Sequence, residues 1–177
     1  MPEDSVASFV VSLAAVTTAL AAVGVAVWQG VENRRHNRRS VQPYLTHYQI
    51  FSATRPCAGV ELSNNGVGPA IITRFEVLVD GAVMEDDGSK GWCKALELLG
   101  LETDWTVFHW LDPGDAVRVG ESLWLLAIPE NDLDRDREQL LRAAIARLVV
   151  RIEYRSVYHE TATLLAADHA LNADRAA

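Results

Sequence analysis

The sequence predicts an N-terminal transmembrane helix followed by a mainly β, antiparallel domain with one or two helical insertions. Three observations predict this fold class. Residues 6–28 carry no charged side chain, several later segments alternate apolar and polar residues, and Asn, Asp, Gly and Pro cluster between those segments. A chain of 177 residues accommodates one domain and an appendage rather than two full domains.

The uncharged segment from Val6 to Trp28 predicts a membrane-spanning helix. At 1.5 Å per residue it reaches about 35 Å, which exceeds a hydrocarbon core of about 30 Å. A cleaved signal peptide is one alternative, because Gly24-Val25-Ala26 loosely resembles a cleavage site, but Glu3 and Asp4 stand where a signal peptide has positive charge. A buried core helix is another alternative, although a small domain cannot cover so long a helix on all sides.

Basic residues lie only on the C-terminal side of this segment. Arg34, Arg35, Arg38 and Arg39 follow it closely, and no Lys or Arg precedes it. Positively charged flanks stay in the cytoplasm, so we expect the N-terminus outside and the domain inside. The four arginines are also suited to rest on anionic lipid headgroups at the membrane surface.

Small side chains recur along one face of the predicted helix and define a small-residue stripe. Its members are Ser8, Ser12, Ala15, Ala19, Ala22 and Ala26. Small residues let two helix backbones approach closely in lipid, so the stripe predicts self-association and a homo-oligomer. The alternative is that alanine is simply frequent in this span, since Ala7, Ala14 and Ala21 lie off the stripe.

Charge and hydropathy divide the chain into five predicted parts. After Ser40 there are 12 basic and 21 acidic residues, a net charge of −9, which disfavours nucleic acid as a partner. The parts are a short N-terminal tail (1–5), the transmembrane helix (6–28), a basic juxtamembrane linker (29–40), the β domain (41–166) and a flexible tail (167–177).

Alternating residues predict the strands of the domain, and turn residues separate them. Asp80-Gly81 is a strong signal for a tight hairpin that returns through Ala82–Met84, and Asp112–Asp115 has Pro and Gly placed for a type II turn. The predicted strands cover Tyr44–Phe51, Gly59–Ser63, Ile71–Val79, Val107–Trp110, Leu148–Arg155 and Val157–Leu165.

Two helical insertions and one further turn complete the predicted domain. Ser89 is the predicted cap of a helix over Gly91–Leu99, and Asn131 or Asp132 caps a second helix. The apolar face of this second helix is formed by Leu133, Leu140, Leu141, Ala144, Ile145 and Leu148. The six residues Asn64–Pro69 form a turn because Asn and Gly accept positive φ and Pro ends pairing.

The segment from Val60 to Ile72, followed by Val79-Asp80-Gly81, resembles the signature of immunoglobulin-like, CARDB-like β-sandwich modules. The whole chain is similar to uncharacterised bacterial single-span proteins, through His36-Asn37-Arg38, Val41-Gln42-Pro43-Tyr44-Leu45 and Tyr154-Arg155-Ser156-Val157-Tyr158. This resemblance implies an Ig-like antiparallel β-sandwich at a bacterial inner membrane and brings no activity with it.

No motif for catalysis, for a cofactor or for a metal occurs in the sequence. The five histidines are scattered, the two cysteines lack metal-ligand spacing, and Asp132, Asp134 and Asp136 lack the Gly and Glu of a Ca²⁺ loop. Trp105, His109, Trp110 and Trp124 are candidates for a pocket, together with Phe108. The competing interpretation is that these aromatic residues pack in the core.

These patterns favour a non-enzymatic, single-pass protein whose cytoplasmic domain acts as an interaction or scaffold module. Its expected partners are the lipid bilayer, another protein and further copies of itself through the helix. The alternative is a ligand-sensing or effector domain, of a stress or phage-defence type, coupled to the membrane helix. An enzyme with a site assembled from distant residues is a third class.

Overall fold

The computed structural model describes residues 3–51, 55–84 and 89–167, and the chain forms two compact units, Met1–Ser40 and Val41–Ala177. The first unit is a single helix, α1 (Glu3–Arg39), of 37 residues. Within it, Ser12–His36 is long and apolar enough to cross a membrane, and none of this segment is buried. A membrane anchor and a signal sequence are both consistent with such a helix.

The helix α1 continues through residues 29–39, which the sequence assigned to a linker. After Gly30 these residues include no Gly or Pro, and Glu and Arg are good helix formers, so nothing stops the helix before Ser40. The amide of Ser40 still bonds to the carbonyl of His36 at 2.9 Å, which closes the last turn. Of the predicted C-terminal tail, residues 168–177 lie outside the described residues.

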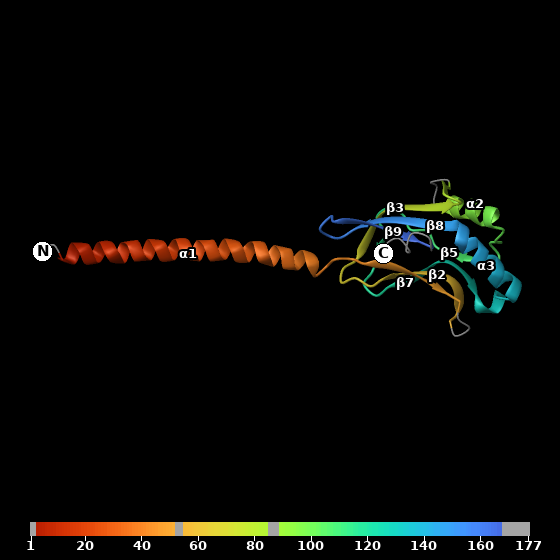
Figure 1. Cartoon of the computed structure of the whole chain (residues 1–177), viewed down its shortest axis with the longest axis horizontal. Coiled ribbons are helices and arrows are strands. Elements are labelled where there is room, and N and C mark those ends of the chain that lie inside the picture. The colour runs from red at the N-terminus through yellow and green to blue at the C-terminus, as the bar shows by residue number, and fades with distance from the viewer. Residues whose placement is uncertain (1–2, 52–54, 85–88, 168–177) are drawn as a thin grey trace, which may run out of the picture. The chain divides into compact units, whose positions relative to one another are not determined.

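The second unit consists of two antiparallel sheets that face each other like a sandwich, and Figure 1 shows them as two layers. Sheet A has the order β1-β2-β7-β5, with the strands β1 (Leu45–Ile50), β2 (Cys57–Asn64), β7 (Ser122–Pro129) and β5 (Val107–Phe108). Sheet B has the order β4-β3-β8-β9, with β4 (Ala82–Val83), β3 (Ala70–Val79), β8 (Leu148–Arg155) and β9 (Thr161–Ala166); β6 (Ala116–Val117) pairs with the start of β3.

The core lies between the two sheets and follows from strand alternation. In β8 every second side chain is buried, and Val150 and Ile152 are fully covered. Val60 and Leu62 of β2 are buried in the same way from the opposite sheet. One apolar side of each sheet thus faces the other, as a sandwich requires.

Two short helices add to the sheets, so the chain as a whole is mixed α/β rather than mainly β. They are α2 (Ser89–Leu99) and α3 (Arg135–Arg147), which lie at the same end of the sandwich in Figure 1. Buried Trp92 of α2 packs near Phe108 of β5, with ring centroids 5.8 Å apart, and α2 also contacts β3. This helix therefore connects the two sheets.

Two local predictions need correction. The cap of α3 is Asp134, whose side chain accepts a bond from the amide of Arg137, because Asn131 and Asp132 belong to a preceding 3₁₀ turn (Glu130–Asp132). The last strand begins at Thr161 rather than Val157, because the hydroxyl of Ser156 accepts bonds from the amides of Tyr158 and Glu160 and holds a turn there.

Candidate functional site

Many of the large hydrophobic side chains that are exposed among the described residues lie on α1. Phe9, Leu20 and Trp28 are each about two-thirds exposed, at 68%, 67% and 66%. The hydroxyls of Thr17 and Thr18 bond to backbone carbonyls one turn back, at 2.8–3.1 Å. The helix therefore satisfies these polar groups internally, as a segment in lipid must.

Each predicted anchoring residue lies on α1. Arg34 and Arg35 are exposed near its C-terminal end, whereas the side chains of Arg38 and Arg39 lie outside the described residues. All six members of the small-residue stripe are exposed, and the hydroxyl of Ser12 bonds to the carbonyl of Ser8 at 2.9 Å. The structure describes one chain, so self-association through the stripe stays a prediction.

The four residues of the predicted aromatic pocket have separate surroundings. The Trp105 indole donates to Glu102 at 3.1 Å and lies under Arg137 of α3. Trp110 packs on Phe75 of the core, with ring centroids 4.8 Å apart. A ring nitrogen of His109 contacts the backbone carbonyl of Trp124 at 3.1 Å.

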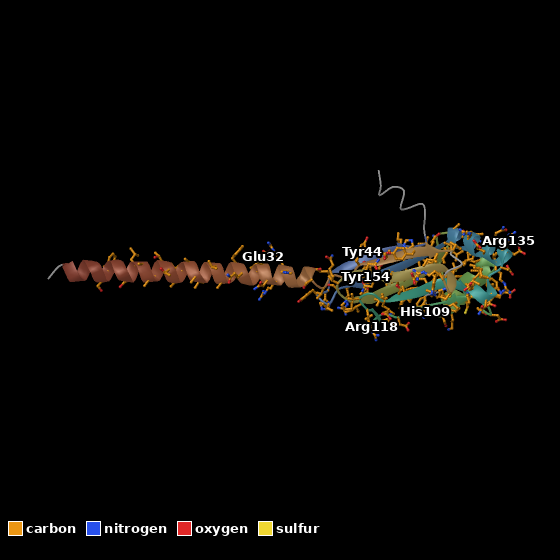
Figure 2. The ribbon with its side chains drawn as sticks, turned by 90° about the horizontal axis from the view of Figure 1, so that it is seen from below. Glu32, Tyr44, His109, Arg118, Arg135 and Tyr154 are labelled. Carbon is orange, nitrogen blue, oxygen red and sulfur yellow. The ribbon has the colours of Figure 1, made fainter. Side chains whose placement is uncertain are left out.

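Most of these aromatic residues pack against the core rather than line a common cavity. Trp105, Phe108 and Trp110 are partly buried hydrophobic residues packed against the core. Trp124 lies on β7 and His109 is exposed, as Figure 2 shows for His109 at the surface of the domain. The aromatic pocket therefore stays a prediction that these contacts do not support.

The two predicted turns differ in their surroundings. Asp112–Asp115 is exposed and has the expected geometry, with the Asp115 amide bonded to the Asp112 carbonyl and Gly114 at φ +104°. The turn Asn64–Pro69 is instead packed against residues 41–44. A Cβ at Gly68 would lie 1.8 Å from the carbonyl oxygen of Val41.

Asn64 explains why this second turn is structural. Its side chain is fully buried, and its Oδ1 accepts bonds from the amides of Tyr44 and Gly66 at 3.2 and 3.0 Å. Its Nδ2 donates to the carbonyls of Gly68 and Val117 at 2.9 and 3.0 Å. One residue thus joins the start of the domain, the turn and β6.

A groove that the sequence analysis missed lies beside the C-terminal end of α2, with a volume of about 560 Å³. Gly100, at φ +72°, ends the helix: its amide bonds to Glu97, and the amide of Leu101 bonds to Leu96, which is a Schellman motif. The groove is lined by Cys93, Leu96, Glu97, Gly100, Leu101, Glu102, Thr103 and Asp104. Three of these carry carboxylates, so the groove favours cations.

Charged and titratable groups elsewhere in the domain have structural surroundings. Glu76, only 4% exposed, pairs with Arg74 at 2.5 Å and with Arg151 at 2.9 Å. Burial raises the pKa of the Cys57 thiol and of the Tyr154 hydroxyl, which also accepts a bond from the amide of Leu45. Figure 2 shows Tyr154 beside Tyr44, at the opposite end of the sandwich from Arg135.

Within residues 3–51, 55–84 and 89–167, no group of three or more His, Cys, Asp or Glu side chains is placed to hold a metal ion. Among known proteins, the family described as "Domain of unknown function (DUF8453)" matches residues 6–170. No curated protein and no solved structure matches the chain.

Proposed function

The chain belongs to the family of the domain of unknown function DUF8453, and we propose that it is a single-pass membrane protein whose domain is an interaction module. The exposed apolar helix α1 carries this proposal. None of the apolar segment of α1 is buried in the chain, and the hydrocarbon core of a membrane would cover this surface. We also propose that α1 is retained as an anchor and is not removed as a signal sequence.

The proposed orientation places the domain in the cytoplasm of a bacterial cell. Its support is the charge asymmetry of α1, with Arg34 and Arg35 exposed near one end and acidic residues, Glu3 and Asp4, at the other. In this orientation Cys57 and Cys93, which are both free thiols, face the reducing cytoplasm.

The proposed fold of the domain is an Ig-like sandwich, and its support is the pair of antiparallel sheets with short turns at their ends. Modules of this kind bind partners through edge strands and exposed turns. Here β9 is the last strand of sheet B, with Thr161 and Thr163 exposed, and the turn Asp112–Asp115 is exposed as well. The buried side chains of Asn64, Glu76 and Ser156 have structural partners, whereas the buried hydroxyl of Thr106 has no hydrogen-bond partner.

Two measurements test the anchor: whether the mature chain keeps its N-terminal residues, and whether it is found in the membrane fraction. We expect intact mass spectrometry to find residues 1–28 still present in protein that remains in membranes after an alkaline wash. A mature chain that lacks α1 and is recovered from the aqueous fraction would contradict the anchor and favour a signal sequence.

The orientation is tested with reporters fused after Ala177. A reporter enzyme that works only in the cytoplasm should be active when it is fused at this position. A reporter that works only after export should be inactive. Replacing Arg34, Arg35, Arg38 and Arg39 by Asn should allow part of the population to invert, whereas replacing Arg135, Arg137, Arg142 and Arg147 in and near α3 should not. Activity of the exported reporter in the native chain would contradict the orientation.

A ligand-sensing domain is the second candidate function, and the groove beside α2 favours it. A volume of about 560 Å³ suits a small molecule, and the carboxylates of Glu97, Glu102 and Asp104 favour a cationic one. Protection of the exposed thiol of Cys93 from alkylation by such a ligand would support this candidate. With that result α1 would still be a membrane anchor, but the domain would bind a small ligand rather than a protein partner.

A further inference from the structure

Three side chains from neighbouring strands form a row on the outer face of sheet A. The register pairs Tyr48 of β1 with Glu61 of β2, and Glu61 with Trp124 of β7. The residues on either side of Glu61, Val60 and Leu62, are fully buried in the core. Because successive side chains of a strand point to opposite faces, Glu61 and its two partners point away from the core. We call Tyr48, Glu61 and Trp124 the Tyr–Glu–Trp row.

The spacing of this row suits a cation. Neighbouring strands lie about 4.8 Å apart, so about 10 Å separates the backbones that carry Tyr48 and Trp124, with Glu61 halfway. A cation is attracted to an aromatic ring when it lies within about 6 Å of the ring centroid. A cation above Glu61 is therefore within reach of both rings and of the carboxylate.

The carboxylate of Glu61 is available for such a contact. Glu61 is half-buried, and its side-chain carboxylate has no hydrogen bond or ion pair with any residue that the structure describes. The carboxylate of Glu76, on the outer face of sheet B, is paired with both Arg74 and Arg151. The carboxylate of Glu76 is thus compensated, whereas that of Glu61 has no cation beside it among the described residues.

The aromatic members of the row are held in place by their neighbours. The Asn65 Nδ2 donates to the Tyr48 hydroxyl at 2.8 Å and to the Thr46 hydroxyl at 2.7 Å. The His109 ring contacts the Trp124 carbonyl, which holds β7 where it passes the end of β5. Because these side chains are ordered before binding, less conformational entropy is lost when a ligand binds.

We propose that the Tyr–Glu–Trp row binds an arginine side chain of a protein partner. The inference rests on the proposed interaction role and adds the chemistry of the partner. A planar guanidinium stacks on aromatic faces and bonds to a carboxylate, which are the two kinds of group in the row. The net charge of −9 after Ser40 attracts a basic partner to the same domain. Tyr48 is 47% exposed, so the row is accessible from solution.

The test is a titration of the full chain in uncharged detergent micelles, labelled with 5-fluorotryptophan and followed by ¹⁹F NMR. The probe is a blocked Gly-Arg-Gly peptide, and the Trp124 signal is assigned from the Trp124→Phe variant. We expect a saturable shift of the Trp124 signal with the arginine peptide and no shift with the matched Gly-citrulline-Gly peptide, which lacks the charge. The Glu61→Gln and Tyr48→Leu variants should each bind about two- to fivefold more weakly.

Two matched variants test whether peptide binding depends on the row or only on general attraction to an acidic domain. Glu153→Gln removes a half-buried carboxylate from β8 of sheet B, and Tyr158→Leu removes a tyrosine of similar exposure, 45%, far along the chain from the row. Both should bind the peptide as the native chain does. The unchanged signals of the other tryptophans report that each variant is folded.

Two outcomes would overturn the proposal. One is the absence of a saturable Trp124 shift, and the other is an equal shift in the Glu61→Gln variant. A shift with phosphocholine and none with the arginine peptide would replace the protein partner by a lipid headgroup, which also overturns it. None of these results bears on the retention of α1 or on the topology, so the membrane anchor stands or falls by its own tests.

Discussion

At the scale of single residues, Asn64 is the side chain on which the start of the domain depends. Both its donor and its acceptor atoms are used while it is fully buried. The Asn64→Asp variant keeps the shape but loses the donor, and leaves the carbonyls of Gly68 and Val117 without a partner. We expect it to lose about 2–4 kcal/mol of unfolding free energy, measured by denaturant titration of tryptophan fluorescence. The exposed Asn131, in the 3₁₀ turn before α3, gives the control, because Asn131→Asp should lose only about 0.5 kcal/mol.

Asp80 gives the domain a predicted acid dependence. Hydrogen bonds from Arg147, the shortest at 2.6 Å, hold the pKa of the Asp80 carboxyl below its ordinary value. An acid whose folded pKa is lowered adds stability above its unfolded pKa of about 3.9, and this stability disappears as the pH falls through the folded pKa. Asn also tolerates the positive φ of 52° at this position, so Asp80→Asn isolates the charge.

The measurement is the unfolding midpoint of the native chain and of Asp80→Asn as a function of pH. We expect the native chain to be the more stable of the two at pH 6 and the difference to vanish in the acid range. The Asp112→Asn variant, in the exposed turn far from Arg147, is the matched control and should show a smaller change. A difference between the native chain and Asp80→Asn that is the same at all pH values would contradict the role of this ion pair.

At the scale of elements, Asp134 caps the N-terminus of α3, and its Oδ1 accepts a bond from the Arg137 amide at 2.8 Å. Asp134→Ala should cost about 1 kcal/mol of unfolding free energy because the first turn of α3 loses its cap. Asp132→Ala tests the cap that the sequence predicted and should cost clearly less, since its side chain only approaches Arg137 at 4.0 Å. Equal losses for the two variants would contradict the assignment of the cap.

Local patterns predicted most of the elements. Alternation from Ile71 to Val79 and the Asp80-Gly81 turn, with positive φ at both residues, correspond to the observed β3–β4 hairpin. The cap of α3 was not predictable in the same way, because Asn131, Asp132 and Asp134 are all good caps. The structure selects Asp134 because a 3₁₀ turn occupies the residues before it.

At the scale of the whole molecule, the candidate sites depend on contacts between distant residues. The Tyr–Glu–Trp row needs the register of three strands, and β1 and β7 are far apart in the sequence. Trp124 is a candidate pocket residue from its local sequence, but no local pattern connects it to Tyr48 and Glu61. By contrast, a long apolar helix depends on consecutive apolar residues, and the sequence alone therefore predicted such a helix near the N-terminus.

Self-association through α1 is the last prediction, and cysteine crosslinking in membranes tests it. In a chain with Cys57 and Cys93 replaced by Ser, Ala15→Cys and Ala19→Cys each place a thiol in the small-residue stripe. If two helices pack along this stripe, oxidation should join a large fraction of either variant into a covalent dimer, because small residues bring the two backbones close.

The matched control is Thr17→Cys. At 100° per residue Thr17 points away from the stripe, so its thiols should remain apart and its dimer fraction should be several times lower. Dilution with added lipid should reduce random collisions at all three positions and preserve the dimers of Ala15→Cys and Ala19→Cys. Equal crosslinking at positions 15, 17 and 19 would indicate collisions, and its absence at positions 15 and 19 would show that the stripe is not an interface. In either case α1 would be an anchor that holds single domains at the membrane.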